Sequence, residues 1–315
     1  MSRISSQMKL VLEQSVALMP TYSITETQLA EVRKKYAQER LFWNSGGPEI
    51  YSTVETKVKG PVGPIPVRMY NPDPIQCLPV LVYLHGGGFV VGNNDSHDRM
   101  MRELAERAGC AVLGVEYSLS PEQKFPVALE ETLSVLEWLK NGEYDKKSPA
   151  FNIDRERIIL GGDSAGASLS MGAALSYKEN LSGLLLIYGW YGLKISSSSS
   201  LPGGAEDGLS EEDMTFYMNS YLHSEDDLND VRLNVLSADL QGFPPCCLIA
   251  AELDPLLDDS TTLATLLEKA DVSCELHLYE SVIHGFLHYS RMLDAAVSAL
   301  DQAAIFLRKI FKTDA

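Results

Sequence analysis

The sequence predicts an α/β protein with a mostly parallel central sheet of about eight strands flanked by helices. Short apolar runs alternate along the chain with longer segments of helical periodicity. From residue 79 onward the short runs are apolar on both alternating faces, which is typical of strands covered by helices on both sides of a sheet. Alternation of this kind indicates βαβ units with right-handed crossovers.

The strands and helices can be placed in order. Strands are expected at residues 51–57, 65–70, 79–84, 111–117, 158–162, 183–188, 246–251 and 275–279. The first two are more polar than the others, and glycine and proline are frequent between them, so we expect an edge hairpin. Helices are expected at residues 96–108, 124–140, 165–178, 258–270 and 288–311.

Two segments interrupt this alternation. Residues 1–45 are mostly helical and precede every strand, and residues 190–243 lie between two core strands. The second segment contains a serine run from Ser196 to Ser200, the glycines Gly203 and Gly204, and an acidic helix near 210–222. A solvent-facing excursion without a role is one interpretation of it. The aromatic residues in its first half favour the other interpretation, a lid over an active site.

Composition excludes several classes of partner. The chain has 315 residues and 26 Lys plus Arg against 43 Asp plus Glu, a formal net charge of −17. Phosphates of nucleic acids and anionic membrane surfaces would repel it. We therefore expect no nucleic acid partner and no membrane association, and no run approaches the roughly 18 apolar residues of a membrane span. The oligomeric state is not determined, although a homo-oligomer is compatible with the sequence.

The cysteines and the N-terminus bear on the cellular compartment. The five cysteines show no CxxC pair, and three of them stand in apolar runs. This pattern suits free thiols in a reducing compartment. The apolar part of the first 20 residues is interrupted by Glu13 and Gln14, unlike a signal peptide. The sequence predicts a cytoplasmic, soluble protein.

The most specific motif is Gly162-Asp163-Ser164-Ala165-Gly166, which lies between a predicted strand and a small-residue helix. In this setting G-x-S-x-G is a tight turn that presents a nucleophilic serine at a helix N-terminus. Side chains at the two outer positions would clash where strand and helix converge. A phosphate-binding loop is the alternative, because Gly161 and Gly166 give G-x-x-x-x-G, but the next residues are Ala167 and Ser168, so the lysine that would reach the phosphates is absent. We take Ser164 as the candidate nucleophile.

A second glycine motif follows the strand at 79–84 and begins with His85. Consecutive glycines allow backbone N–H groups to approach a substrate oxygen closely. We expect the N–H groups of Gly87, Gly88 and Ala165 to stabilise an oxyanion. A dinucleotide-binding fingerprint would need a further glycine at position 91, which is Val91. His85 is interpreted as a residue that shapes the loop.

A serine nucleophile needs a base and an acid, which follow it in chain order in enzymes with this turn. Of the four later histidines, His284 lies in a loop directly after the last predicted strand and is our candidate base. The other three belong to the insert, to a strand and to the C-terminal helix: His223, His277 and His288. Zinc binding by His284 and His288 lacks a third ligand nearby.

The candidate acid is Asp254, which directly follows the strand at 246–251 and precedes a proline. Glu252 is the second choice. Asp258 and Asp259 are interpreted as carboxylates that complement the dipole of the next helix.

Together these segments resemble the hormone-sensitive-lipase family of α/β-hydrolases, from about residue 79 to the end. The motifs that carry the resemblance are His85-Gly86-Gly87-Gly88-Phe89, Tyr117-Ser118-Leu119-Ser120-Pro121-Glu122, Gly162-Asp163-Ser164-Ala165-Gly166, Asp254-Pro255-Leu256 and His284-Gly285-Phe286. Within that family the sequence is most similar to bacterial acetyl esterases, through residues 92–99, 191–193 and 284–292. Glu116 and Ser118 depart from the family pattern, which usually has Asp and Arg there, in a structural loop.

The resemblance implies an α/β-hydrolase fold with a helical cap. It implies one domain, residues 1–315, with a core of about 46–189 and 244–315 and a cap formed by 1–45 and 190–243. It also implies a serine carboxylesterase that cleaves short acyl esters, with Ser164, Asp254 and His284 as the triad and Gly87, Gly88 and Ala165 as the oxyanion hole. We expect no cofactor, and the acidic surface favours a small neutral ester as substrate.

Two alternatives use the same motifs. An amidase or formamidase would share the triad, because the nucleophile motif does not distinguish an ester from an amide. A non-catalytic ligand receptor on the same scaffold is disfavoured, because such a protein should have lost a triad residue.

Overall fold

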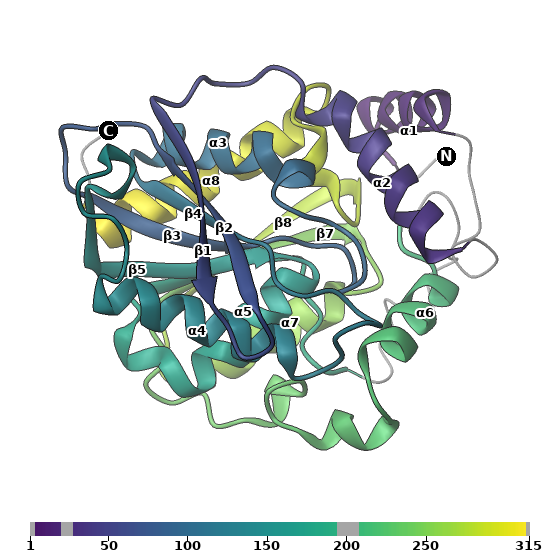
Figure 1. Ribbon diagram of the computed structural model, residues 1–315. Helices are drawn as coiled ribbons and strands as arrows, with labels where there is room; N and C mark the ends of the chain where they lie inside the picture. Colours follow the sequence, from purple (N-terminus) through teal and green to yellow (C-terminus); the bar gives the residue numbers. More distant parts are fainter. Residues whose placement is uncertain (1–3, 20–27, 194–207, 313–315) are drawn as a thin grey trace.

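The structure is a computed structural model that describes residues 4–19, 28–193 and 208–312 (Figure 1). In these residues the strands form one sheet in the order β1-β2-β4-β3-β5-β6-β7-β8. The strands are β1 (Ser52–Lys59), β2 (Pro64–Asn71), β3 (Leu78–Leu84), β4 (Ala111–Val115), β5 (Ile153–Asp163), β6 (Gly183–Ile187), β7 (Cys246–Leu253) and β8 (Cys274–Ile283). β3 to β8 are parallel, and β2 runs antiparallel to both β1 and β4. The predicted edge hairpin is therefore confirmed.

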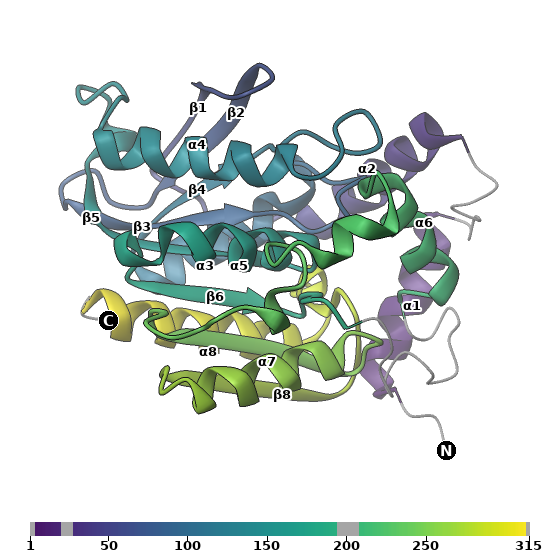
Figure 2. The same cartoon turned by 90° about the horizontal axis from the view of Figure 1, so that it is seen from below.

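Helices cover both faces of the sheet (Figures 1 and 2). They are α1 (Ser6–Leu18), α2 (Leu29–Asn44), α3 (Asp98–Ala108), α4 (Val127–Asn141), α5 (Ala165–Tyr177), α6 (Glu211–Tyr221), α7 (Leu257–Lys269) and α8 (Asp294–Phe311). β3 shows how the two faces separate, because side chains alternate along a strand. Val80 and Val82 pack into the core with α4, α5 and α7, whereas Leu81 and Tyr83 pack with α3 and α8.

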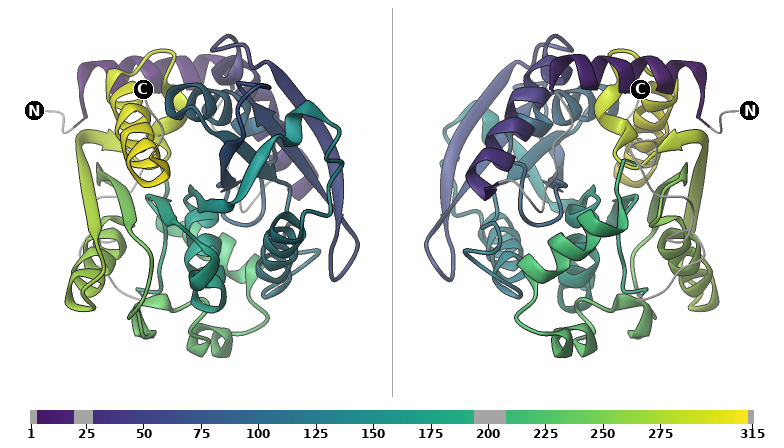
Figure 3. Two further views of the ribbon diagram at one scale, coloured as in Figure 1. Left: turned by 90° about the vertical axis from the view of Figure 1, so that its left-hand side faces the viewer. Right: turned by 90° about the vertical axis from the view of Figure 1, so that its right-hand side faces the viewer.

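Three helices lie apart from these layers, beyond the carboxyl ends of the parallel strands (Figure 3). α2 and α6 meet over the loop that follows β3, where Val90 and Val91 are buried with Val32 of α2. Phe216 and Tyr217 of α6 pack against the same cluster. α1 lies beside α2, and the amide of Ser5 at its start donates to Ser281 O at 2.9 Å. Segments from opposite parts of the chain therefore gather over one edge of the sheet.

The N-terminus of α6 explains why an acidic helix forms in the insert. Ser210 accepts a hydrogen bond from the amide of Asp213, and the Asp213 carboxylate accepts one from the amide of Ser210. This capping box satisfies two amides that a helix leaves unpaired at its start. The serine run Ser196–Ser200 and the glycines Gly203 and Gly204 lie outside the described residues.

One expected helix begins later than its sequence suggests. We predicted a helix from residue 288 to 311, but α8 begins at Asp294, and His288 belongs to a short 3-10 helix over Phe286–Tyr289. The prediction was wrong here because four consecutive residues of this short helix are buried. A surface α-helix buries one stripe rather than every successive side chain. Among the described residues, no helix is both long and apolar enough to cross a bilayer.

Candidate functional site

The candidate nucleophile lies at a strained turn between β5 and α5. Ser164 has φ 52° and ψ −119°, outside the regions that L-residues normally occupy. Its amide donates to Ile187 O of β6 at 2.8 Å, which ties the turn to the neighbouring strand. The turn places the hydroxyl at the amino end of α5, whose first amides have no carbonyl partner within the helix.

The two outer glycines of the motif are required by packing. A Cβ on Gly166 would lie 1.9 Å from Leu84 O, and one on Gly162 would lie 2.1 Å from the same atom. Both positions therefore touch the backbone of β3, which cannot move aside as a flexible side chain could. The clash expected from the sequence is present, and the structure identifies Leu84 as the residue that causes it.

The three candidate triad residues come together at the carboxyl ends of β5, β7 and β8. His284 Nε2 lies 2.9 Å from Ser164 Oγ, and His284 Nδ1 lies 2.7 Å from Asp254 Oδ2. Because an ionised carboxylate only accepts hydrogen bonds, Nδ1 carries the proton and Nε2 is free to accept from the hydroxyl. This is the geometry in which an imidazole can remove the serine proton.

Asp254 is held by its own turn. It is 1% exposed, and its Oδ1 accepts the amide of Leu256 at 2.8 Å, so the other oxygen faces His284. The second-choice acid, Glu252, points elsewhere, since its Oε2 accepts the amide of Ser281 at 2.7 Å. The ring of Tyr188 packs edge-on to His284, with centroids 4.9 Å apart, and limits the tilt of the imidazole. The remaining late histidines have other neighbours: the amide of His223 donates to Asp227 Oδ2 at 2.7 Å, and His277 Nε2 lies 3.7 Å from Glu275 Oε2.

The glycine loop after β3 lies beside the nucleophile. Gly87, Gly88 and Ala165 line the same pocket as Ser164 and His284. Gly87 has φ 122°, and a Cβ there would lie 2.2 Å from Val91 O. Gly88 has φ 57°, and its Cβ would lie 2.3 Å from the ring of Tyr217. The loop thus has a conformation and packing that only glycine permits, and its backbone borders the reacting hydroxyl.

His85 lies on the other side of this loop. It is 2% exposed, stacks on Tyr117 with centroids 4.3 Å apart, and its Nδ1 lies 2.8 Å from Gly86 O. Burial, followed by the charge of His97, lowers the pKa of His85 to about 3, so the ring is neutral at ordinary pH. These contacts are those of a loop-shaping residue. Nearby, Ser118 donates to Glu131, and Glu116 accepts the amide of Asn94, so both atypical residues hold structural loops.

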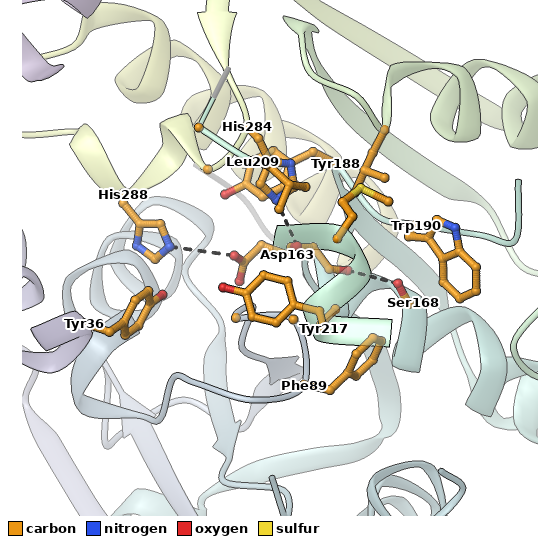
Figure 4. A pocket seen from close by; sticks show the side chains of 18 of the residues that line it. Tyr36, Phe89, Asp163, Ser168, Tyr188, Trp190, Leu209, Tyr217, His284 and His288 are labelled. Atoms are coloured by element: carbon orange, nitrogen blue, oxygen red, sulfur yellow. Dashed lines mark hydrogen bonds and ion pairs between the residues drawn. The ribbon is translucent and has the colours of Figure 1, made fainter. Parts of the chain in front are cut away.

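The pocket in front of Ser164 has a cavity of about 140 Å³. Figure 4 shows Tyr36 and His288 on one side of it and Trp190 and Phe89 on the other. The polar or charged residues that line the pocket include Tyr36, Arg40, Asp163, His288 and Tyr289. The apolar residues that line it include Phe89, Trp190, Leu209, Met214, Met218 and Leu256. α2 and α6 therefore supply much of the wall, while the core supplies the candidate triad.

A family model described as alpha/beta hydrolase fold matches residues 81–288. The chain belongs to the alpha/beta hydrolase fold family. An acetyl esterase of Salmonella agona (strain SL483) is 39% identical, with 99% of this chain and 97% of the relative covered. An acetyl esterase of Salmonella schwarzengrund (strain CVM19633) is 38% identical with the same coverage. The resemblance to the hormone-sensitive-lipase family is thereby confirmed.

Solved structures agree with this assignment. A hyperthermophilic esterase from Pyrobaculum calidifontis has a TM-score of 0.91 and 29% identity, with 98% of this hydrolase and 99% of that chain covered. EstE1, a thermophilic carboxylesterase cloned from a metagenomic library, has a TM-score of 0.86 and 28% identity, with 93% of this chain and 100% of that chain covered. The predicted α/β-hydrolase fold is confirmed.

Asp163 of this hydrolase, next to the nucleophile, organises a buried polar cluster that the sequence interpretation missed. Its Oδ1 accepts from Tyr83 Oη at 2.9 Å and from the Gly86 amide at 3.0 Å, and lies 3.3 Å from His97 Nε2. Burial raises the pKa of Asp163, but the charge and hydrogen bond of His97 outweigh it and hold the pKa below its usual range. Through the hydrogen bond from the Gly86 amide, Asp163 connects the glycine loop to the turn that contains the candidate nucleophile.

The same cluster is the one group of three ligand-type side chains that the described residues bring within reach of a single ion. Ligand atoms of His97, Asp163 and His288 lie within 4.8 Å of one another, and all three residues are buried. His288 Nε2 is 3.8 Å from Asp163 Oδ2, so His288 pairs with this cluster rather than with His284. An ion would have to displace the hydrogen bonds that Asp163 already accepts. The position of Asp163 inside the nucleophile motif is the sequence signal for its importance.

Asp259 does more than complement the dipole of α7, because it also binds backbone amides of the segment that follows β6. It lies in the first turn of α7, as expected, but it is 2% exposed and its Oδ1 accepts the amides of Tyr191 at 2.7 Å and Leu193 at 3.2 Å. Burial raises its pKa to about 7. Asp259 therefore anchors the chain after β6, where the insert begins. Asp258, its half-buried neighbour in the same turn, fits the original interpretation.

Proposed function

We propose that this hydrolase is a serine carboxylesterase that cleaves short-chain acyl esters. The observation that carries the proposal is the continuous hydrogen-bonded series from Ser164 Oγ through His284 to Asp254, with bond lengths of 2.9 and 2.7 Å. Ester hydrolysis by an acyl-enzyme needs a nucleophile, a base and an orienting acid in this order. The relatives that are esterases by name support the same reaction.

In the proposed mechanism Ser164 Oγ attacks the ester carbonyl carbon while His284 Nε2 takes its proton. Asp254 keeps the imidazole in the Nδ1–H tautomer and stabilises the imidazolium. The oxyanion accepts hydrogen bonds from the amides of Gly87, Gly88 and Ala165, which cost no reorganisation because their backbone is already constrained. His284 then protonates the leaving alcohol, which departs and leaves the acyl group on Ser164. In the second half-reaction water attacks the acyl-enzyme while His284 takes a proton from it, and His284 then returns that proton to Ser164 as the carboxylic acid is released.

The size of the pocket supports a short acyl chain. The cavity measures about 140 Å³, and an engineered cavity of about 150 Å³ in another protein accommodates benzene. An acetyl or propionyl ester has a comparable number of heavy atoms, whereas a long acyl chain would have to leave the cavity. We further propose that α1, α2 and α6 form a cap over one hydrolase core, since α2 and α6 line the pocket but add no strand to the sheet.

The test compares wild type with Ser164→Ala on 4-nitrophenyl esters from acetate to laurate. We expect kcat on the acetate to fall by about 10⁵-fold or more in the variant. The matched control is Ser176→Ala, an exposed serine on the same helix α5, which should keep wild-type turnover. Turnover retained by Ser164→Ala would overturn the proposal, and an optimum at eight carbons or longer would overturn the short-chain assignment.

A further inference from the structure

The pocket wall contains a buried cation, Arg40, two of whose nitrogen atoms have no hydrogen-bond partner among the described residues. Arg40 of α2 lines the pocket and is 9% exposed. Within the described part of the chain, its Nε and Nη1 are buried and have no hydrogen-bond partner. Its guanidinium carbon lies 4.6 Å from the ring centroid of Tyr36 and 6.0 Å from that of Tyr289. The guanidinium also forms hydrogen bonds with the side chains of Tyr36 and Tyr289, whereas Nε and Nη1 stay unpaired.

The carboxylates near Arg40 do not satisfy those donors. Glu39 Oε2 is 3.7 Å from Arg40 Nε, beyond hydrogen-bond distance, and Glu39 Oε1 already accepts from Ser15 Oγ and Trp43 Nε1. Asp163 also lines the pocket, but its hydrogen bonds come from Tyr83, Gly86 and His97. A guanidinium removed from water needs good hydrogen bonds to offset its desolvation. The unused donors are therefore a costly feature of the free protein.

A second unpaired donor belongs to another residue that lines this pocket, Tyr188. Tyr188 is 1% exposed, and its Oη has no hydrogen-bond partner among the described residues. Tyr188 lines the pocket with Arg40, and its ring contacts the imidazole of His284. Burial raises the pKa of Tyr188 well above its usual value, so the hydroxyl stays protonated and can donate. The pocket lining thus includes a cation with two unpaired nitrogen atoms and a tyrosine hydroxyl without a hydrogen-bond partner among the described residues.

We propose that the pocket binds esters that carry a carboxylate, and that this carboxylate accepts hydrogen bonds from the Arg40 guanidinium and the Tyr188 hydroxyl. The inference rests on the proposed esterase function and specifies its substrate class. A carboxylate has the planar shape that a guanidinium recognises, and the bonds are charge-assisted. A neutral amide of the same shape presents only one acceptor and no charge.

This replaces the expectation of a neutral ester, which rested on the net charge of −17. That charge is spread over the surface and is screened within about 8–10 Å at ordinary ionic strength. Arg40 is buried in the pocket, where its charge is screened much less. The local cation therefore governs binding of a substrate once it has entered, while the overall charge affects the rate of encounter.

The experiment uses two pairs of substrates in which only the charge changes. Acetoxyacetate and acetoxyacetamide place the group on the alcohol side of the ester, and monomethyl succinate and methyl succinamate place it on the acyl side. In wild type we expect kcat/KM, measured by acid release, to favour the carboxylate by about 10- to 100-fold in one pair. Arg40→Gln should bring that ratio to about one, and Arg40→Lys, which keeps the charge, should recover part of it.

The control and the outcomes separate this inference from the proposed function. Lys34→Gln removes one positive charge from the exposed face of the same helix and should keep the wild-type ratio. Equal kcat/KM within both pairs, or a preference that survives in Arg40→Gln, overturns the inference while ester hydrolysis stands. If 4-nitrophenyl acetate is not hydrolysed at all, the proposed function fails. Calorimetric titration of Ser164→Ala with acetoxyacetate and its amide then tests the site without turnover, and equal or absent binding overturns the inference.

Discussion

The pocket has two walls that are built in different ways. On the core side, Ser164, Asp254 and His284 each stand at the carboxyl end of a strand, and each is held by hydrogen bonds to backbone or to another triad residue. On the helical side, Arg40, Tyr36 and Tyr217 come from α2 and α6 and are positioned by aromatic packing. The three candidate catalytic side chains of the core wall are hydrogen-bonded to one another, whereas Nε and Nη1 of Arg40 on the helical wall have no hydrogen-bond partner among the described residues.

This difference separates the two tasks of the site. Acyl transfer tolerates little displacement of the reacting atoms, and the proposed catalytic groups stand at the ends of strands within one hydrogen-bonded eight-stranded sheet. Recognition of the rest of the substrate needs a surface that can differ among related proteins without disturbing the sheet. The helices α2 and α6 can supply such a variable surface, because they lie across the strand ends and are not part of the sheet. If catalysis depends on the core wall and substrate recognition on the helical wall, substitutions in the two walls should have separable effects.

The largest effect is expected from the core wall. Asp254→Asn keeps the shape of the acid but supports the wrong imidazole tautomer, so kcat on 4-nitrophenyl acetate should fall by about 10⁴-fold. Glu252→Gln is the matched control, because that carboxylate contacts the Ser281 amide and not His284. Equal losses in the two variants would contradict the assignment of Asp254 as the orienting acid.

An intermediate effect is expected where the two walls touch. Gly88→Ala would place a Cβ 2.3 Å from the Tyr217 ring of α6, and we expect kcat to fall by about 10²- to 10³-fold as the loop amides move. Removing the ring in Gly88→Ala/Tyr217→Ala should recover part of this loss. Gly109→Ala is the control, since Gly109 has a similar φ of 59° but no atom within 4 Å of the added Cβ. No recovery in the double variant would show that the clash with α6 is not the cause.

The smallest effect concerns stability rather than turnover. The pKa of buried Asp259 is raised to about 7, so the folded protein holds this proton more tightly than the unfolded chain does. The stabilisation is complete below the unfolded pKa and is lost as pH rises toward 7. Asp259→Asn imitates the protonated acid, and it should exceed wild type in unfolding free energy by about 1–3 kcal/mol at pH 8.

The measurement for Asp259 is urea unfolding of both proteins from pH 4 to pH 8. The difference in unfolding free energy between Asp259→Asn and wild type should be smallest at pH 4 and should increase until about pH 7. Asp258→Asn, on the more exposed neighbour in the same turn of α7, should give curves parallel to wild type. A gap that does not change with pH would contradict the raised pKa of Asp259.

Much of the fold and of the candidate site could be predicted because their signals are local. The turn at Ser164 can be recognised in the sequence by its two outer glycines, which are required because β5 and α5 pack closely on β3. Asp254 and His284 each follow a strand closely, and parallel strands bring their carboxyl ends to one edge. The start of α8 was mispredicted because His288 is buried by contacts with Asp163 and His97, residues far from it in the chain.

The sequence by itself determined the sheet, the turn that holds the nucleophile and the three residues proposed for catalysis, since each depends on neighbours a few positions away. Only the tertiary structure decided what faces the substrate. Arg40 has no sequence motif around it. The role that we propose for it in substrate binding depends on α2 lying over the strand ends, where Arg40 lines the pocket and its Nε and Nη1 have no hydrogen-bond partner among the described residues. Asp259 likewise matters through amides of residues 191 and 193. Burial and unsatisfied hydrogen bonds are properties of packing between distant segments, and sequence patterns do not encode them locally.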